Sequence, residues 1–237
     1  MSPQRYLTIL ALPFGLLFAW LAIEPYDRAD WALENLLVAL FVIALAASAR
    51  RFPLSKISYS LIFLFLCLHE VGAHHTYAEV PYDAFLVEYF GFSLNQAMGW
   101  DRNHFDRFVH FAYGLLLAYP VREVFCRIAD AKGFWSYFFP LELVMATSML
   151  FELFEWGAAE LFGGDLGIAY LGTQGDVWDA HKDMLLASIG ALIAMLVVLA
   201  LNSRIQKNFA QEWRDSLRIK QRQPLGEVEI RRLREEQ

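Results

Sequence analysis

The chain alternates between long apolar runs and short polar connections. Six runs approach or exceed the ~20 residues that a helix needs to cross a hydrocarbon core of ~30 Å. They cover residues 6–23, 31–48, 58–77, 108–126, 137–161 and 177–201. None shows the strict alternation of apolar and polar residues that is typical of a membrane β-barrel. The pattern therefore predicts an all-α, polytopic membrane protein whose residues 1–202 form six transmembrane helices.

A different pattern follows the last apolar run. Ile205, Phe209, Trp213 and Leu217 recur every four residues among basic side chains. A helix with this spacing has one apolar and one basic face, and such helices lie along anionic membrane surfaces. Residues 203–237 are therefore expected to form a cytoplasmic, basic tail that contains an amphipathic helix.

The basic residues predict the orientation of the spans. Sixteen of the twenty lysines and arginines fall in the N-terminal segment, in the connections after the second and fourth runs, and in the tail. Connections rich in lysine and arginine stay on the cytoplasmic side of a membrane. Both termini are thus expected to be cytoplasmic, and the connections at 24–30, 78–105 and 162–176 are expected to face outward.

The composition agrees with a membrane protein. Of the 237 residues, 57% are hydrophobic and 16% are aromatic, and the mean hydropathy is +0.34. Membrane lipid is therefore the expected surrounding partner. The sequence has neither a nucleotide-binding loop nor a basic nucleic-acid patch on the outer side, so we expect no nucleic-acid partner.

Ionisable residues gather at the outer ends of four of the predicted spans. These four segments are far apart in sequence, and nothing local forces their polar groups to one depth. Charged groups inside a bilayer are costly unless they are paired, hydrated or bound to an ion, so they mark a functional site. The residues are His69, Glu70, His74 and Tyr77; Asp106, Arg107 and His110; Glu152 and Glu155; and Asp176, Asp179 and Asp183.

Helical spacing indicates which of these side chains point together. The three aspartates are separated by three and then four residues, so one helix would carry them on a single face. The same spacing relates Glu70, His74 and Tyr77, and it relates Asp106 to His110. Glu152 and Glu155 are three residues apart. The four segments therefore predict one pocket with two histidines and about six carboxylates.

So many carboxylates at short range repel one another unless protons or cations compensate their charge. A divalent metal, with zinc, manganese or iron as candidates, is the simplest compensation for a carboxylate and histidine site in a helix bundle. The predicted ligands are His69, Glu70, His74, Asp106, His110, Asp176, Asp179 and Asp183. The predicted catalytic residues are Glu152 or Glu155 as a general base, Arg107 (or Arg102) as a clamp for an anionic group, and Tyr77. Alternatively, the two glutamates form structural ion pairs with the two arginines.

Four blocks of this sequence resemble a known family. Residues 69–81, 106–111, 151–156 and 172–184 look like the signature blocks of the YjdF-like bacterial inner-membrane proteins. The resemblance extends to about residue 200 and implies a polytopic protein of the bacterial inner membrane, without supplying a reaction. The family pattern points to the same histidines, carboxylates, arginine and tyrosine, except Glu70. It usually has glutamine at the position of His181, which weakens His181 as a ligand.

Two classes of function fit this pattern. The first is a metal-dependent membrane enzyme, with hydrolysis of a lipid or amphiphile at the outer leaflet as the preferred chemistry and a di-iron oxidase as a variant. The second is a cation transporter or sensor that uses the same acidic pocket. The outer position of the polar groups favours the enzyme, because the inner halves of the spans offer little that would continue an ion path.

Overall fold

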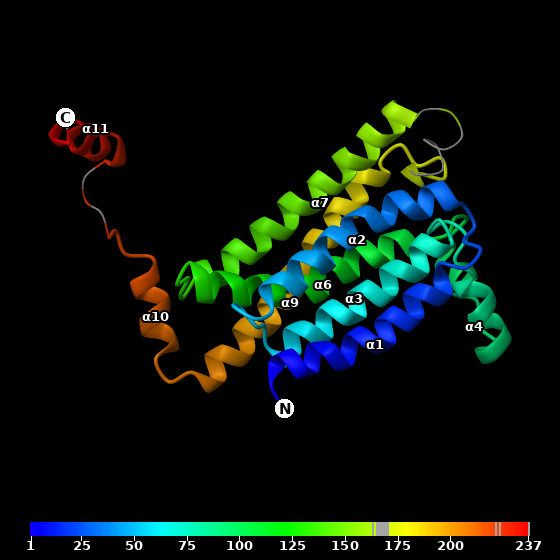
Figure 1. Cartoon of the computed structure of the whole chain (residues 1–237), viewed down its shortest axis with the longest axis horizontal. Coiled ribbons are helices and arrows are strands. Elements are labelled where there is room, and N and C mark those ends of the chain that lie inside the picture. The colour runs from blue at the N-terminus through cyan, green and yellow to red at the C-terminus, as the bar shows by residue number, and fades with distance from the viewer. Residues whose placement is uncertain (163, 165–170, 221, 223, 237) are drawn as a thin grey trace.

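The computed structural model describes the whole chain apart from residues 163, 165–170, 221, 223 and 237. The described residues form ten helices and no strand. Six long helices run side by side (Figure 1), namely α1 (Pro3–Leu21), α2 (Arg28–Ser48), α3 (Lys56–His74), α6 (Phe105–Ile128), α7 (Trp135–Phe162) and α9 (Asp179–Ile205). The all-α prediction is thus confirmed for the described part of the chain.

Five of the long helices, α1, α2, α3, α7 and α9, are long and apolar enough to cross a membrane. The remaining long helix, α6, has 24 residues and therefore measures about 36 Å. It carries five charged side chains and falls outside that set. The chain is therefore a polytopic membrane protein, and the prediction of a sixth span depends on α6.

Polar side chains fix the beginnings of the first three helices. Ser2 and Ser55 accept hydrogen bonds from backbone N–H groups in the first turns of α1 and α3. Asp27 accepts bonds from the N–H groups of Ala29 and Asp30 at the start of α2. These N-caps satisfy donors that a helix leaves unpaired. The helices consequently begin at these polar residues rather than where the apolar runs begin.

Helix α6 lies at the centre of the bundle, in contact with α3, α7 and α9, while α1 and α2 pack against α3. Its closest neighbour is α9, which runs parallel to it. A Cβ atom built on Gly114 would lie 1.9 Å from the carbonyl oxygen of Ala187, and one on Gly190 would lie 2.2 Å from that of Phe111. Glycine at both positions therefore lets the two backbones touch, as small residues do between membrane helices.

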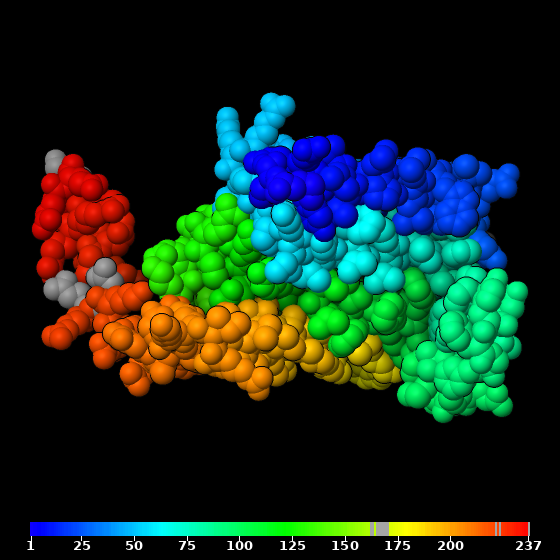
Figure 2. All heavy atoms as spheres, turned by 90° about the horizontal axis from the view of Figure 1, so that it is seen from below, coloured from blue at the N-terminus to red at the C-terminus, as the bar shows by residue number. Residues whose placement is uncertain are grey.

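Two short helices, α4 (Tyr82–Phe90) and α5 (Leu94–Met98), follow α3 in the predicted outer connection. They lie at the end of the bundle remote from the C-terminal segment (Figures 1 and 2). The side chain of Asp83 joins them, because it accepts a hydrogen bond from the backbone N–H of Asn95 at 3.0 Å. Phe85, Tyr89 and Phe90 remain exposed on α4.

The tail beyond α9 contains α10 (Phe209–Ser216) and α11 (Leu225–Glu235), and α9 itself continues past the predicted boundary at residue 202. Phe209 and Trp213 pack against the bundle. The indole N–H of Trp135 donates to the carbonyl of Ser216 at 2.8 Å and so ties α10 to the start of α7. The aromatic face predicted to meet lipid therefore meets protein in α10.

Candidate functional site

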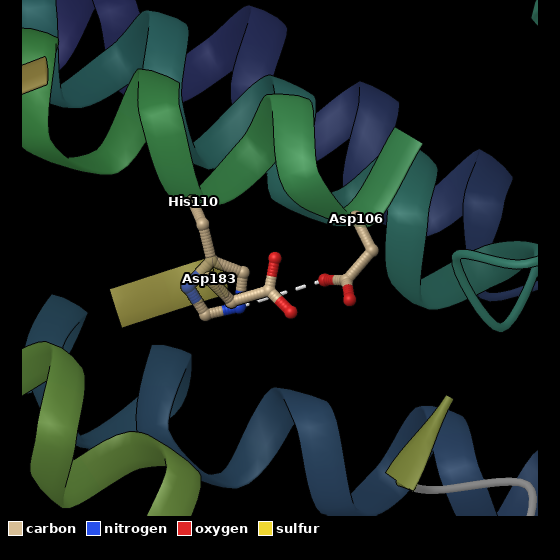
Figure 3. Close-up of side chains that lie close together, drawn as sticks. All are labelled: Asp106, His110 and Asp183. Atoms are coloured by element: carbon tan, nitrogen blue, oxygen red, sulfur yellow. Dashed lines mark ion pairs between the residues drawn. The ribbon is translucent and has the colours of Figure 1, made fainter. Parts of the chain in front are cut away.

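The contact of α6 with α9 brings Asp106, His110 and Asp183 together (Figure 3). Because the helices are parallel and Gly114 touches Ala187, the residues one turn earlier, His110 and Asp183, also face each other. Each of the three side chains offers one ligand atom, and these atoms lie within 4.8 Å of one another. Asp183 is only 2% exposed.

A fourth polar group reaches this cluster from α7. The Nε2 atom of His110 lies 3.5 Å from an oxygen of Glu152 and 3.5 Å from an oxygen of Asp106. Glu152 Oε1 and Asp183 Oδ1 are buried, and neither accepts a hydrogen bond from a described residue. Buried charged oxygens without partners are costly. The cluster therefore offers donor atoms of the types that could hold a divalent cation.

The other two aspartates of the predicted site are paired with arginines. Arg102 donates two hydrogen bonds to Asp179, at 2.6 and 3.1 Å. Arg107 donates to Asp179 at 2.9 Å and to Asp176 as well. The Lys182 ammonium donates to Asp176 at 2.5 Å. This arginine–aspartate network joins the segment before α6 to the beginning of α9.

The expectation that all three aspartates share one helical face is wrong for Asp176. Helix α9 begins at Asp179, and Asp176 lies in the preceding turn, where its carbonyl accepts a bond from the Asp179 N–H. Asp179 and Asp183 are four residues apart on α9, but the first binds arginines and the second faces His110. The structure also pairs Arg102 and Arg107 with Asp176 and Asp179 instead of with Glu152 and Glu155.

Asp176 and His104 lie at the edge of the network, outside the spanning helices. The Lys182 ammonium, the Trp178 backbone N–H and the Arg107 guanidinium hold the pKa of Asp176 well below its usual range. Burial, with help from Arg107 and Arg102, lowers the pKa of His104. Asp176 thus keeps its charge and His104 is neutral at neutral pH. The depressed pKa of Asp176 also means that its stabilising effect is lost only in strongly acidic solution.

The histidines of α3 have separate surroundings. The hydroxyl of Tyr77 and Nδ1 of His69 are hydrogen-bonded at 2.7 Å, and Nε2 of His69 is buried without a partner among the described residues. Nδ1 of His74 instead donates to the carbonyl of Leu21 at 2.7 Å, at the end of α1. The predicted common face of His74 and Tyr77 is therefore split, because Tyr77 lies beyond the end of α3 and turns back over Gly72.

Replacing Tyr77 by phenylalanine tests the bond to His69. We expect the free energy of unfolding to fall by about 1–2 kcal/mol, because a buried ring nitrogen loses its partner. Unfolding of the purified protein by titration with sodium dodecyl sulfate in mixed micelles measures the change. Tyr89→Phe, at an exposed position of α4, is the matched control. Equal effects of the two substitutions would contradict this assignment.

A second set of buried polar groups lies on α2 and α3, and its three members on α2 were not among the residues predicted from the sequence. Asp30, Glu34 and Asn35 of α2 are buried, as is Glu70 of α3. Each has at least one oxygen that accepts no hydrogen bond within the described ranges. The four-residue spacing of Asp30 and Glu34 could have indicated a shared polar face on α2, because it puts both carboxylates on one side of a helix. The apolar run 31–48 excludes Asp30 and contains Glu34 as a single carboxylate near its beginning.

A cavity of about 440 Å³ lies between α2, α3, α6 and α7. Its polar end is formed by His69, Tyr77, Asp106, His110 and Glu155. Leucine, valine and phenylalanine side chains line most of the rest. Asp106 and His110 thus also face a space large enough for a small ligand.

The sequence matches the family model described as "Predicted membrane protein (DUF2238)" over residues 6–204. It is also 36% identical over 200 residues to the inner membrane protein YjdF of Escherichia coli strain K12. The aligned residues cover 84% of this chain and 91% of that protein. The chain belongs to the DUF2238 family. The resemblance seen in the four sequence blocks is therefore confirmed.

Membership of the DUF2238 family agrees with the helical architecture and with a membrane location. The matched residues include all six long helices of the bundle except the first three residues of α1 and the last residue of α9. The E. coli relative is an inner membrane protein by its name. No solved structure matches the chain significantly.

Proposed function

We propose that this DUF2238 protein is a metal-dependent membrane enzyme, with hydrolysis of a lipid or other amphiphile as its reaction. The observation that carries the proposal is the convergence of Asp106, His110 and Asp183, whose ligand atoms lie within 4.8 Å of one another. The unpartnered buried oxygens of Asp183 and Glu152 beside this group support it. If the cluster were held only by structural ion pairs, its carboxylate oxygens would accept hydrogen bonds from the arginines.

The donor set fits a divalent ion. One imidazole and two carboxylates are ligands suited to zinc, manganese or iron, and catalytic zinc sites commonly have three protein ligands and one open position. Arg102 and Arg107 are bound to Asp176 and Asp179, so neither forms an ion pair with Asp106 or Asp183. Of the eight ligands expected from the sequence, the proposal therefore keeps three as the direct metal ligands.

A bound divalent cation would supply positive charge next to the bond that is cleaved. Glu152 is placed beside His110, and in the proposed reaction it accepts a proton from the attacking water. The oxygen of that water joins the carbon or phosphorus of the ester, the bond to the leaving oxygen breaks, and the proton passes from Glu152 to that oxygen. Tyr77 and Glu155 line the adjoining cavity, where they face the substrate's polar group.

The two arginines have a positioning role in this proposal. Both contact Asp179, which precedes Asp183 by one turn of α9. They hold the beginning of α9 against the first turn of α6 and the segment before it, and so they keep Asp183 opposite His110. The earlier idea that Arg107 clamps an anionic substrate group is replaced, because its guanidinium is already bound to two aspartates.

The proposal includes a topology with α6 as the sixth span and both termini in the cytoplasm. Helix α6 is long enough to cross the membrane and is packed between α3, α7 and α9. The excess of lysine and arginine at the α10 end supports a cytoplasmic position for that end. The metal-ligating cluster then lies near the outer surface of the bacterial inner membrane, within reach of outer-leaflet lipid.

A cation transporter or sensor remains the second candidate, and one observation favours it. The buried carboxylates of Asp30, Glu34 and Glu70 extend the acidic region from the cluster toward α2 and α3. Intramembrane carboxylates without partners are also typical of ion and proton pathways. A transporter would bind its cation reversibly and exchange it across the membrane, whereas the proposed enzyme retains its metal.

Metal content tests the proposal. We expect the detergent-purified wild type, after reconstitution and removal of free ions, to retain about one zinc, manganese or iron ion per chain. Asp183→Asn is expected to weaken binding at least ~10-fold, because even outer-shell changes commonly have that effect. Asp215→Asn, at an exposed ion pair of α10, is the control and should retain the metal. Equal metal content in the two variants, or none in the wild type, would refute the proposed site.

A further inference from the structure

We infer that one hydrocarbon tail of a membrane lipid occupies the cavity between α2, α3, α6 and α7. The lipid enters sideways between α2 and α7 and brings its polar linkage to Asp106, His110 and Asp183. This inference rests on the proposed function, since it names the substrate class of the same site. The tail site itself depends on separate residues, so it can be tested separately.

The polarity of the lining changes along α6. Asp106, His110, Tyr113, Leu117 and Val121 all face the cavity and follow one another at intervals of three or four residues. The carboxylate and imidazole stand at one end, the tyrosine lies between, and aliphatic side chains occupy the other end. A molecule that matches this order has a polar group joined to a long apolar tail.

The dimensions suit a single chain. The 15 helical steps from Asp106 to Val121 correspond to about 22 Å of helix, which exceeds the ~15 Å of one leaflet's hydrocarbon layer. A volume of about 440 Å³ spread over about 22 Å gives a mean cross-section of about 20 Å². A helix with a diameter of ~10 Å has roughly four times that cross-section. The space therefore admits an unbranched tail and excludes a partner helix.

The cavity opens toward lipid between α2 and α7. Helix α2 packs chiefly on α3, and α7 packs on α6 and α9, so no extensive contact between the described helices closes this side. Leu37 and Phe41 of α2 and Leu150 and Phe154 of α7 line the cavity and are at the same time exposed on the bundle surface. In a bilayer these side chains border the hydrocarbon region, which connects the cavity to the tails of surrounding lipids.

A lipid tail also explains how the apolar part of the cavity is filled. Water occupies cavities that offer it two to four polar partners, which the leucine and valine end does not provide. An empty space of this size lowers stability in proportion to its volume. The bilayer supplies hydrocarbon at the opening in excess, so the occupant is a membrane lipid that diffuses laterally rather than an amphiphile captured from solution.

Photocrosslinking tests the tail site. The probe is a diacyl phospholipid with a diazirine midway along one acyl chain, mixed into vesicles of phosphatidylethanolamine and phosphatidylglycerol that hold the full-length protein. We expect crosslinks to be enriched at least fivefold on the α6 peptide containing Leu117 and Val121, relative to lipid-facing peptides of α1. Both residues line the cavity, whereas the exposed side chains of α1 meet bulk lipid.

Variants at the opening provide the matched comparison. Leu150→Trp should lower the crosslinking of Leu117 and Val121 at least fivefold, because Leu150 lines the cavity. Leu153→Trp should leave it unchanged, since Leu153 lies on the same helix, is similarly exposed (50% against 46%), and does not line the cavity. Ser148→Phe, which fills the buried interior of the cavity, should act like Leu150→Trp.

The outcomes separate the tail site from the metal site. Uniform labelling of all lipid-facing helices, or equal effects of Leu150→Trp and Leu153→Trp, would overturn the tail site. Labelling by an added lysophospholipid but not by the diacyl probe would overturn the membrane source. Metal content is measured in the same samples. Enriched labelling in a protein without metal would refute the proposed metal chemistry while supporting the tail site.

Discussion

Replacing Arg102 by alanine is expected to lower the free energy of unfolding by about 3 kcal/mol, because it leaves a buried carboxylate without its bidentate partner. Asp179 is 3% exposed and receives two hydrogen bonds from Arg102. One bond from Arg107 remains in the variant, which keeps the loss at the lower end of the range for a broken buried pair. Unfolding in mixed micelles with sodium dodecyl sulfate measures it.

A surface pair provides the control for that experiment. The guanidinium of Arg218 lies 3.1 Å from a carboxylate oxygen of Asp215, and its side chain is 75% exposed. Arg218→Ala is expected to change the free energy of unfolding by less than about 1 kcal/mol. Arg102→Lys should fall between the two alanine variants, because lysine keeps the charge and loses the fork geometry. Equal losses for Arg102→Ala and Arg218→Ala would show that the buried network does not stabilise the fold.

Replacing Gly114 by alanine is expected to lower the free energy of unfolding by at least as much, about 3 kcal/mol or more. The added Cβ would lie 1.9 Å from the carbonyl oxygen of Ala187 and 2.7 Å from the backbone nitrogen of Ala191. These are backbone atoms of α9, so the two helices would have to move apart. Because the same contact holds His110 opposite Asp183, the variant should also lose metal affinity.

Gly157→Ala is the matched control on α7. A Cβ at that position meets no atom of a described residue within 4 Å, so we expect the substitution to be neutral or to stabilise the helix by roughly 0.5–1 kcal/mol. Both variants are measured by micellar unfolding and by metal titration. A Gly114→Ala protein with wild-type stability and metal affinity would contradict the close α6–α9 contact.

The helices could be predicted from the sequence because long apolar runs suffice to locate them. The run 58–77 became α3 (Lys56–His74), and the run 108–126 became α6 (Phe105–Ile128). Their ends shifted because capping and loop geometry set them locally. Ser55, for example, accepts the Ser58 N–H and starts α3 before the apolar run begins.

The sequence alone could not predict which side chains contact one another within the site. Spacing put Asp179 and Asp183 on one face, but only the parallel contact of α6 with α9 gives the first to arginine and the second to His110. The partner of His74 is the carbonyl of Leu21, a backbone group more than fifty residues away in the chain. Residue type does not reveal such contacts, because they depend on how helices are placed relative to one another.

Anomalous X-ray scattering at the absorption edge of the retained metal tests the metal centre most directly. Crystals of the wild-type protein should show one peak bounded by Asp106, His110 and Asp183, the three groups that converge in Figure 3. Crystals of Asp183→Asn should lose that peak and keep the fold. A peak elsewhere, for example at the neighbouring rings of His74 and His75, or no peak after soaking in zinc, manganese and iron salts, would contradict the proposed centre.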